Sequence, residues 1–99
     1  MADSSSAKSA ATAAIDTRSD GLIALSKDIW AHPEPGFRER RTAKVAAKYM
    51  REIGLAPREN IAITGVIARV ETGRPGPHVA IIGELDSLIV PEHHAADPE

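Results

Sequence analysis

Hydrophobic positions along this chain follow a helical period first and a strand-like pattern afterwards. Apolar residues three and four apart predict one helix from residue 16 or 19 to 31 and another over 38–53. β-Branched residues then predict a strand over 66–70, and a continuous apolar run predicts a second strand over 78–84. Because a short Gly- and Pro-rich turn separates these strands, the pattern favours an antiparallel hairpin. Two helices followed by a hairpin indicate an α/β layered fold.

The first 15 residues differ in composition from the rest of the chain. They are rich in Ser and Ala and contain little that could pack, so they predict a flexible leader or the frayed start of a helix. Residues 16–99 form the structured part, in which Pro33 and Pro35 end the first helix and Gly54 ends the second.

Composition limits the chain to one small domain and excludes several classes of protein. Of its 99 residues, 42% are hydrophobic and 26% are charged, and its formal net charge of −2 argues against a nucleic-acid binder. It has no cysteine, so it contains neither a disulfide nor a thiolate metal site. No apolar run approaches the roughly 20 residues of a membrane span, and no secretory signal is evident. We therefore expect a cytoplasmic protein without membrane or nucleic-acid partners.

Two acids at the end of the 78–84 run are the main candidates for chemistry. If the strand stays extended through residue 86, Glu84 and Asp86 point to the same side. In open α/β sheets, ligands bind beyond the carboxyl ends of strands, so the pair is a candidate for part of a metal or catalytic site. The alternative is a strand that simply ends in solvated acids.

Other candidates have structural explanations that the sequence alone favours. His32 and Glu34 lie in a proline-rich loop that is more simply a rigid connection than a catalytic element. His93 and His94 are adjacent, so they do not share a helix face as paired ligands usually do. A metal site made by these two residues with His78 remains a third, weaker alternative.

Four motifs in order resemble a known enzyme family. They are Asp-Ile-Trp-Ala-His-Pro-Glu-Pro-Gly-Phe at 28–37, Ile-Gly-Leu at 53–55, Thr-Gly-Val-Ile-Ala at 64–68 with Gly-Pro at 76–77, and Glu-Leu-Asp-Ser-Leu at 84–88. Together they resemble the amino-terminal part of metal-dependent amidohydrolases and peptidases, which include aminoacylase-like, aminobenzoyl-glutamate and auxin-conjugate hydrolases. The resemblance covers roughly residues 20–92. Ser87 departs from the family's usual Ala, and Ile89 departs from its usual Pro.

The resemblance implies a fold, a reaction and roles for the two acids. The fold would be the start of a three-layer αβα zinc-exopeptidase-like domain, here incomplete. The reaction would be hydrolysis of the amide bond in N-acyl amino acids or similar small substrates, with zinc or manganese in the full-length enzyme. Asp86 corresponds to an aspartate that orients a histidine ligand, and Glu84 occupies a position where peptidase relatives carry a metal-binding histidine.

The family's Cys-Gly-His motif and later ligands have no counterpart in this sequence. We therefore expect residues 16–99 to be a truncated part of a catalytic domain that is inactive alone and binds no metal tightly. Whether the full-length protein forms a homodimer is left open. A non-catalytic α/β module that associates with another chain is the alternative function.

Overall fold

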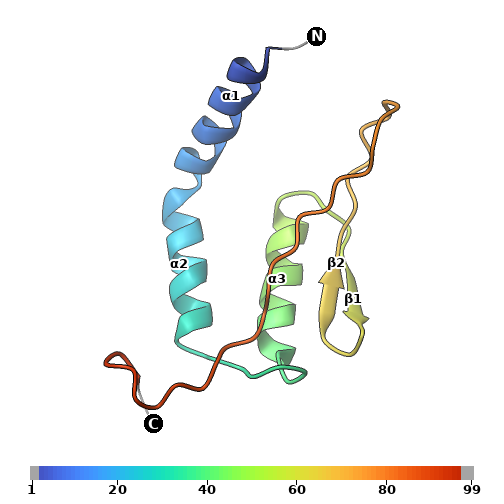
Figure 1. Cartoon of the computed structure of the whole chain (residues 1–99). Coiled ribbons are helices and arrows are strands. Elements are labelled where there is room, and N and C mark those ends of the chain that lie inside the picture. The colour runs from blue at the N-terminus through green and yellow to red at the C-terminus, as the bar shows by residue number, and fades with distance from the viewer. Residues whose placement is uncertain (1–2, 97–99) are drawn as a thin grey trace. The chain divides into compact units, whose positions relative to one another are not determined.

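The computed structural model describes residues 3–96, and the chain divides into two units, Met1–His32 and Pro33–Glu99 (Figure 1). The first unit holds two helices, and the second holds one helix and two short strands. Three helices followed by an antiparallel hairpin are compatible with the start of an α/β fold, as the sequence predicts.

Two consecutive helices make up the first unit. Helix α1 (Ser4–Thr17) begins at Asp3, whose carboxylate accepts a hydrogen bond of 3.1 Å from the Ser5 N–H, and all of its residues are exposed. Helix α2 (Ser19–Trp30) follows after Arg18 and confirms the first predicted helix. Its half-buried positions include the predicted apolar residues Leu22, Leu25 and Ile29. Within residues 3–96, no helix combines the length and apolar character needed to cross a membrane.

The extra helix falls on the segment predicted as a leader. Of the two alternatives for the first 15 residues, the structure shows a helix, while flexibility of the segment stays a prediction. Met1, Ala2 and residues 97–99 lie outside the described part of the chain.

Helix α3 (Arg40–Glu52) confirms the second predicted helix, and its carboxyl end has the predicted glycine cap. Gly54 has a φ of 90°, and its N–H donates to the Arg51 carbonyl at 3.0 Å. The Leu55 N–H donates to the Met50 carbonyl at 2.9 Å, which completes a Schellman motif. A residue with a Cβ would be strained at this φ, so the cap depends on glycine.

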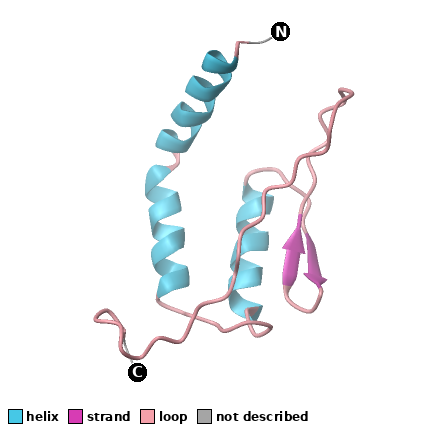
Figure 2. Ribbon diagram, in the orientation of Figure 1, coloured by secondary structure: helices cyan, strands magenta, loops and turns pink. Residues whose placement is uncertain are grey.

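Strands β1 (Arg58–Ile61) and β2 (Gly65–Ile67) form an antiparallel pair with an irregularity in its register (Figure 2). The tight turn between them places Ala62 at φ 46° and Ile63 at φ 86°. A Cβ on Gly65 would lie 2.6 Å from the Ile61 carbonyl oxygen, so the close approach of the strands requires glycine there.

Helix α3 packs on both strands, and the core between them is small. Its apolar members are Ala43, which is 7% exposed, and Ala47, which is fully buried. The larger apolar residues of the helix, Val45, Tyr49 and Met50, are only half-buried, and Ile53, which follows the helix, is exposed. An exposed ion pair between Arg51 and Glu59 also joins the helix to β1.

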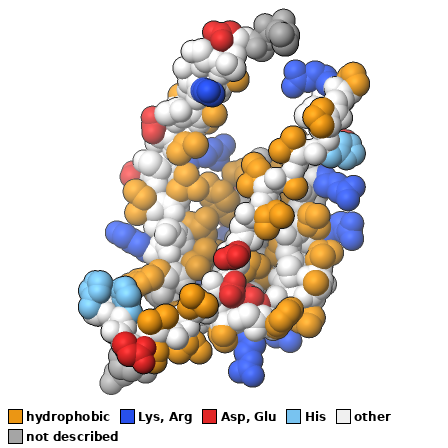
Figure 3. Space-filling view, in the orientation of Figure 1, with side chains coloured by type: hydrophobic (Ala, Val, Ile, Leu, Met, Phe, Trp, Pro, Cys, Tyr) orange, Lys and Arg blue, Asp and Glu red, His pale blue; other side chains and the backbone are white. Residues whose placement is uncertain are grey.

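The predicted hairpin between 66–70 and 78–84 is wrong. The hairpin instead joins β1 to β2, and residues 78–90 form no strand (Figure 2). A strand that is apolar on both faces needs a hydrogen-bonding neighbour and a layer on each side, and the described part of the chain supplies neither to residues 78–84. Val79, Ile81 and Ile82 are therefore 85%, 98% and 89% exposed. Figure 3 shows hydrophobic side chains exposed on the visible face of the molecule.

Candidate functional site

The two candidate acids lie in an extended segment. Exposure alternates along it: Glu84, Asp86 and Leu88 are exposed, whereas Leu85 and Ser87 are half-buried. Alternation with a period of two is what an extended backbone produces, and it is consistent with Glu84 and Asp86 sharing a side. Their roles in catalysis stay predictions.

Ser87 connects this segment to the proline-rich loop. Its backbone N–H donates a hydrogen bond of 2.8 Å to the carbonyl oxygen of Glu34. Asp86 is the residue immediately before this donor, so the loop fixes the backbone next to the candidate carboxylate. Sequence reasoning did not connect these two motifs, because a contact between residues 53 positions apart leaves no local signal.

Glu34 also caps helix α3 with its side chain. One carboxylate oxygen accepts from the Arg41 N–H at 2.8 Å, and the other accepts from the Thr42 N–H at 2.7 Å and from the Thr42 hydroxyl at 2.8 Å. These donors lie in the first turn of the helix, where backbone N–H groups have no partner within the helix. The sequence-based preference for a structural loop therefore has a specific basis at Glu34.

The hydrogen bonds at Glu34 favour the ionised form of its carboxylate. Burial alone would raise its pKa, but hydrogen bonds from the N–H groups of Thr42 and Arg41 and from the Thr42 hydroxyl outweigh that effect. The positive charge of Arg41 acts in the same direction, and the pKa of Glu34 is lowered from its ordinary value.

Glu39, the residue before helix α3, is a buried acid. It is only 7% exposed, and its carboxylate accepts a hydrogen bond of 2.7 Å from the hydroxyl of buried Thr64. The pKa of Glu39 is lowered, chiefly by this bond and then by its own backbone N–H. The bond joins the start of α3 to the turn before β2. In the sequence, only the Thr-Gly motif at 64–65 indicated that Thr64 has a special position.

The histidines have local partners or neighbours. His32 Nδ1 lies 2.8 Å from the Asp28 carbonyl oxygen, at the end of α2. The rings of His93 and His94 lie 4.4 Å apart, and the Ala95 N–H donates to His93 Nδ1 at 3.1 Å. These contacts describe a helix end and a loop turn, in agreement with the structural alternative for each.

A metal site is not formed by the residues that the structure describes. Within residues 3–96, no three His, Asp or Glu side chains lie close enough together to hold a metal ion. Protein zinc sites need three or four such ligands, so the described residues do not fit the metal that the resemblance implies.

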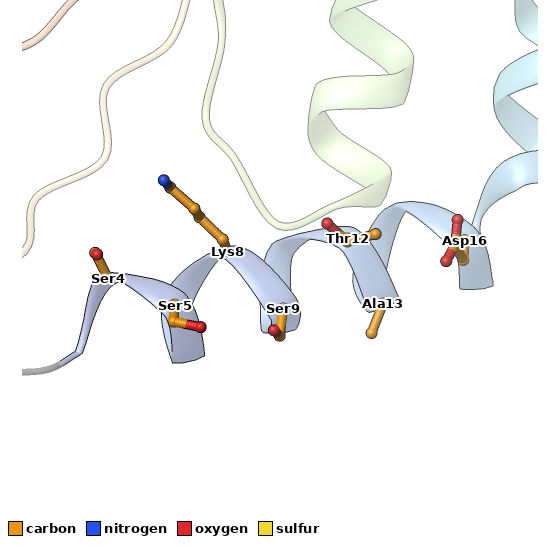
Figure 4. Close-up of a pocket in the computed structure, with 7 residues that line it drawn as sticks. All are labelled: Ser4, Ser5, Lys8, Ser9, Thr12, Ala13 and Asp16. Atoms are coloured by element: carbon orange, nitrogen blue, oxygen red, sulfur yellow. The ribbon is translucent and has the colours of Figure 1, made fainter.

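A surface hollow occurs on helix α1 and involves none of the candidate site residues. Figure 4 shows its lining, which comes from a single helix: Ser4, Ser5, Lys8, Ser9, Thr12, Ala13 and Asp16. Small polar side chains on an exposed helix explain this hollow, and it has no feature of an active site.

Comparison with known proteins supports the resemblance inferred from the motifs. The chain is 36% identical over 73 residues to IAA-amino acid hydrolase ILR1-like 2 of Arabidopsis thaliana, which is 74% of this chain and 16% of that protein. It is 29% identical over 75 residues to thermostable carboxypeptidase 1 of Saccharolobus solfataricus (75% of this chain, 19% of that protein). It is 30% identical over 80 residues to N-acyl-L-amino acid amidohydrolase of Geobacillus stearothermophilus (81% and 22%).

These relatives define a class of proteins, the hydrolases. More narrowly, the chain is similar to part of amidohydrolases and carboxypeptidases, in agreement with the amidohydrolases and peptidases that the motifs predicted. The matched residues span between 16% and 22% of the length of the relatives. No family model matches the chain. No solved structure matches it either.

Proposed function

We propose that this chain forms part of the catalytic domain of a metal-dependent amidohydrolase. The substrate class is the N-acyl amino acids and related small amides, and the setting is cytoplasmic. The observation that carries the proposal is similarity over about three quarters of the chain to hydrolases whose names specify amide or peptide substrates.

The complete catalytic domain, in this proposal, is a three-layer αβα sandwich. Residues 78–84 become an inner strand once neighbouring strands pair with them. The exposed side chains of Val79, Ile81 and Ile82 support this, because such a run costs free energy when it faces water. The strand would then deliver Asp86 to the sheet edge at which α/β enzymes bind ligands.

Asp86 is the residue to which we assign a direct role, and Glu84 is a second candidate. In the complete domain, Asp86 would orient a histidine ligand of a divalent metal, zinc or manganese, and the ligands would come from outside the described residues. This assignment comes from the motif at 84–88 and is supported by the exposure of the carboxylate. Because the described residues form no metal site, we expect the 99-residue chain alone to be inactive.

A chimera tests this proposal directly. Residues 20–92 would replace the corresponding segment of the Geobacillus stearothermophilus N-acyl-L-amino acid amidohydrolase, and hydrolysis of N-acyl amino acids would be measured. We expect an active chimera in which Asp86→Asn lowers kcat/KM about 10- to 100-fold. Glu92→Gln, an exposed acid in the same region, is the matched control and should leave activity unchanged. A folded chimera whose activity is insensitive to Asp86→Asn would refute the role of Asp86.

A non-catalytic module that associates with another chain is the second candidate. The exposed apolar residues of 79–82 favour it, because unpaired extended segments are templates for pairing. It predicts a chimera that folds without activity, together with a 99-residue chain that forms a stoichiometric complex with a partner protein.

A further inference from the structure

We infer that Glu34 is a positioning residue for Asp86. The carboxylate of Glu34 binds the start of helix α3, and its backbone carbonyl binds the N–H of Ser87, the residue after Asp86. The catalytic part of this inference rests on the proposed function. The link, by which we mean the hydrogen bonds that join α3 to Ser87 through Glu34, can be tested without any assay of hydrolysis.

The carboxylate end of the link is well defined. Three hydrogen bonds of 2.7–2.8 Å reach it from Arg41 and Thr42 at the start of α3, and Thr42 is buried. Charged acceptors at a helix start form stronger hydrogen bonds than neutral ones, and the positive end of the helix dipole adds to the attraction. The side chain of Glu34 is therefore held in one orientation relative to the helix.

The backbone of Glu34 is restricted by its neighbours. Pro33 and Pro35 flank it, and a residue that precedes proline is excluded from the helical region. Because both the side chain and the backbone of Glu34 are restricted, its carbonyl oxygen points in a fixed direction. That oxygen accepts the 2.8 Å hydrogen bond from Ser87, the residue after Asp86.

Within residues 71–96, the other hydrogen bonds are local. They include the bond from the Arg74 N–H to the Thr72 hydroxyl and the bond from the His93 N–H to the Val90 carbonyl. The bond to Glu34 differs because it reaches another element, and it does so next to the candidate carboxylate. A shift of Asp86 by about 1 Å could cost about 100-fold in rate, so a fixed point at Ser87 would matter for catalysis.

Amide hydrogen exchange and NMR on the 99-residue chain test the link. A scalar coupling across the hydrogen bond from the Ser87 nitrogen to the Glu34 carbonyl carbon should be present in the unchanged protein. In Glu34→Ala this coupling should disappear, and the Ser87 amide should exchange at least about tenfold faster. The Leu55 amide, which caps the opposite end of α3, should change by less than about threefold.

Two further variants separate positioning from general loss of structure. Glu34→Gln retains an acceptor oxygen and should restore most of the Ser87 protection. Glu59→Gln, which removes a charge paired with Arg51 on α3, is the matched control and should leave Ser87 unchanged. Equal acceleration at Ser87 and Leu55 in Glu34→Ala would overturn the inference, and so would unchanged exchange at Ser87.

The chimera adds a functional readout that can fail independently. There, Glu34→Ala should lower kcat with little change in KM, and Glu34→Gln should recover part of kcat. If the chimera is inactive while the Ser87 results hold, the proposed function fails and the link remains. If the chimera is active but insensitive to Glu34→Ala, the positioning role fails and the proposed function stands.

Discussion

Glu34 and Glu39 link the stability of the second unit to pH. Both have lowered pKa values in the folded chain, so the unfolded chain binds protons to them first as the pH falls. Their stabilising contribution is present above about pH 4.3, the usual unfolded value for glutamate, and is lost as the pH falls through the folded values. We expect the urea concentration at the midpoint of unfolding of the second unit, which contains α3, to decrease between neutral pH and about pH 3.

Circular dichroism during urea unfolding at several pH values measures this effect. Thr64→Val removes the hydroxyl that donates to Glu39, so it should flatten part of the pH dependence. Thr72→Val is the control, because it removes an exposed hydroxyl whose hydrogen-bond partner is the Arg74 N–H and not a carboxyl group. An equally steep pH dependence in both variants would show that the bond from Thr64 to Glu39 does not contribute.

Residue by residue, buried polar contacts could not be predicted from the local sequence. The acids of 84–88 became candidates because their spacing is local, and their roles stay predictions. The burial of Glu39 could not be predicted, because its partner, Thr64, is 25 positions away and only the fold brings them together. Glu34 makes structural contacts, as the sequence favoured, yet its two sets of partners depend on how the chain turns at Gly36 and Phe37, where Phe37 adopts a φ of 62°.

At the scale of elements, helices were predictable and the hairpin was not. Helices α2 and α3 follow from an apolar period within each segment and from local end signals such as Gly54. The β1–β2 hairpin depends on Ala62 and Ile63 adopting positive φ, which side chains with a Cβ normally avoid, so composition gave no sign of a turn there. The glycine-rich segment at 72–77 carried a stronger turn signal but joins no paired strands.

The hairpin should be sensitive to one methyl group at Gly65. In Gly65→Ala the new Cβ would lie 2.6 Å from the Ile61 carbonyl oxygen, so the strands must separate or the turn must change. We expect the free energy of unfolding to fall by about 1–3 kcal/mol. Gly83→Ala is the matched control, since a Cβ there meets nothing within 4 Å, and it should change stability by less than about 0.5 kcal/mol. Urea unfolding measures both variants, and equal midpoints would rule out the close approach.

For the whole molecule, the pattern of exposure contrasts a small buried core with larger apolar residues that are exposed. The apolar core of the second unit is formed by alanines, while the apolar run around Ile81 and Ile82 is exposed. A two-stranded pair supported by one helix buries little apolar surface, so its stability is expected to be marginal. The same run would be an internal strand in the proposed sandwich, and the exposed side chains are those that such a sheet would bury.

Metal binding by the 99-residue chain is the most direct test at this scale. We expect calorimetric titration with zinc or manganese to show no saturable site, because residues 3–96 do not bring three ligands together and Asp86 is exposed. Asp86→Ala should give the same flat titration. Tight one-to-one binding that is lost in Asp86→Ala would mean that the chain assembles its own centre. Our placement of the metal ligands outside the described residues would then be wrong, and the chain itself would be a candidate for catalysis.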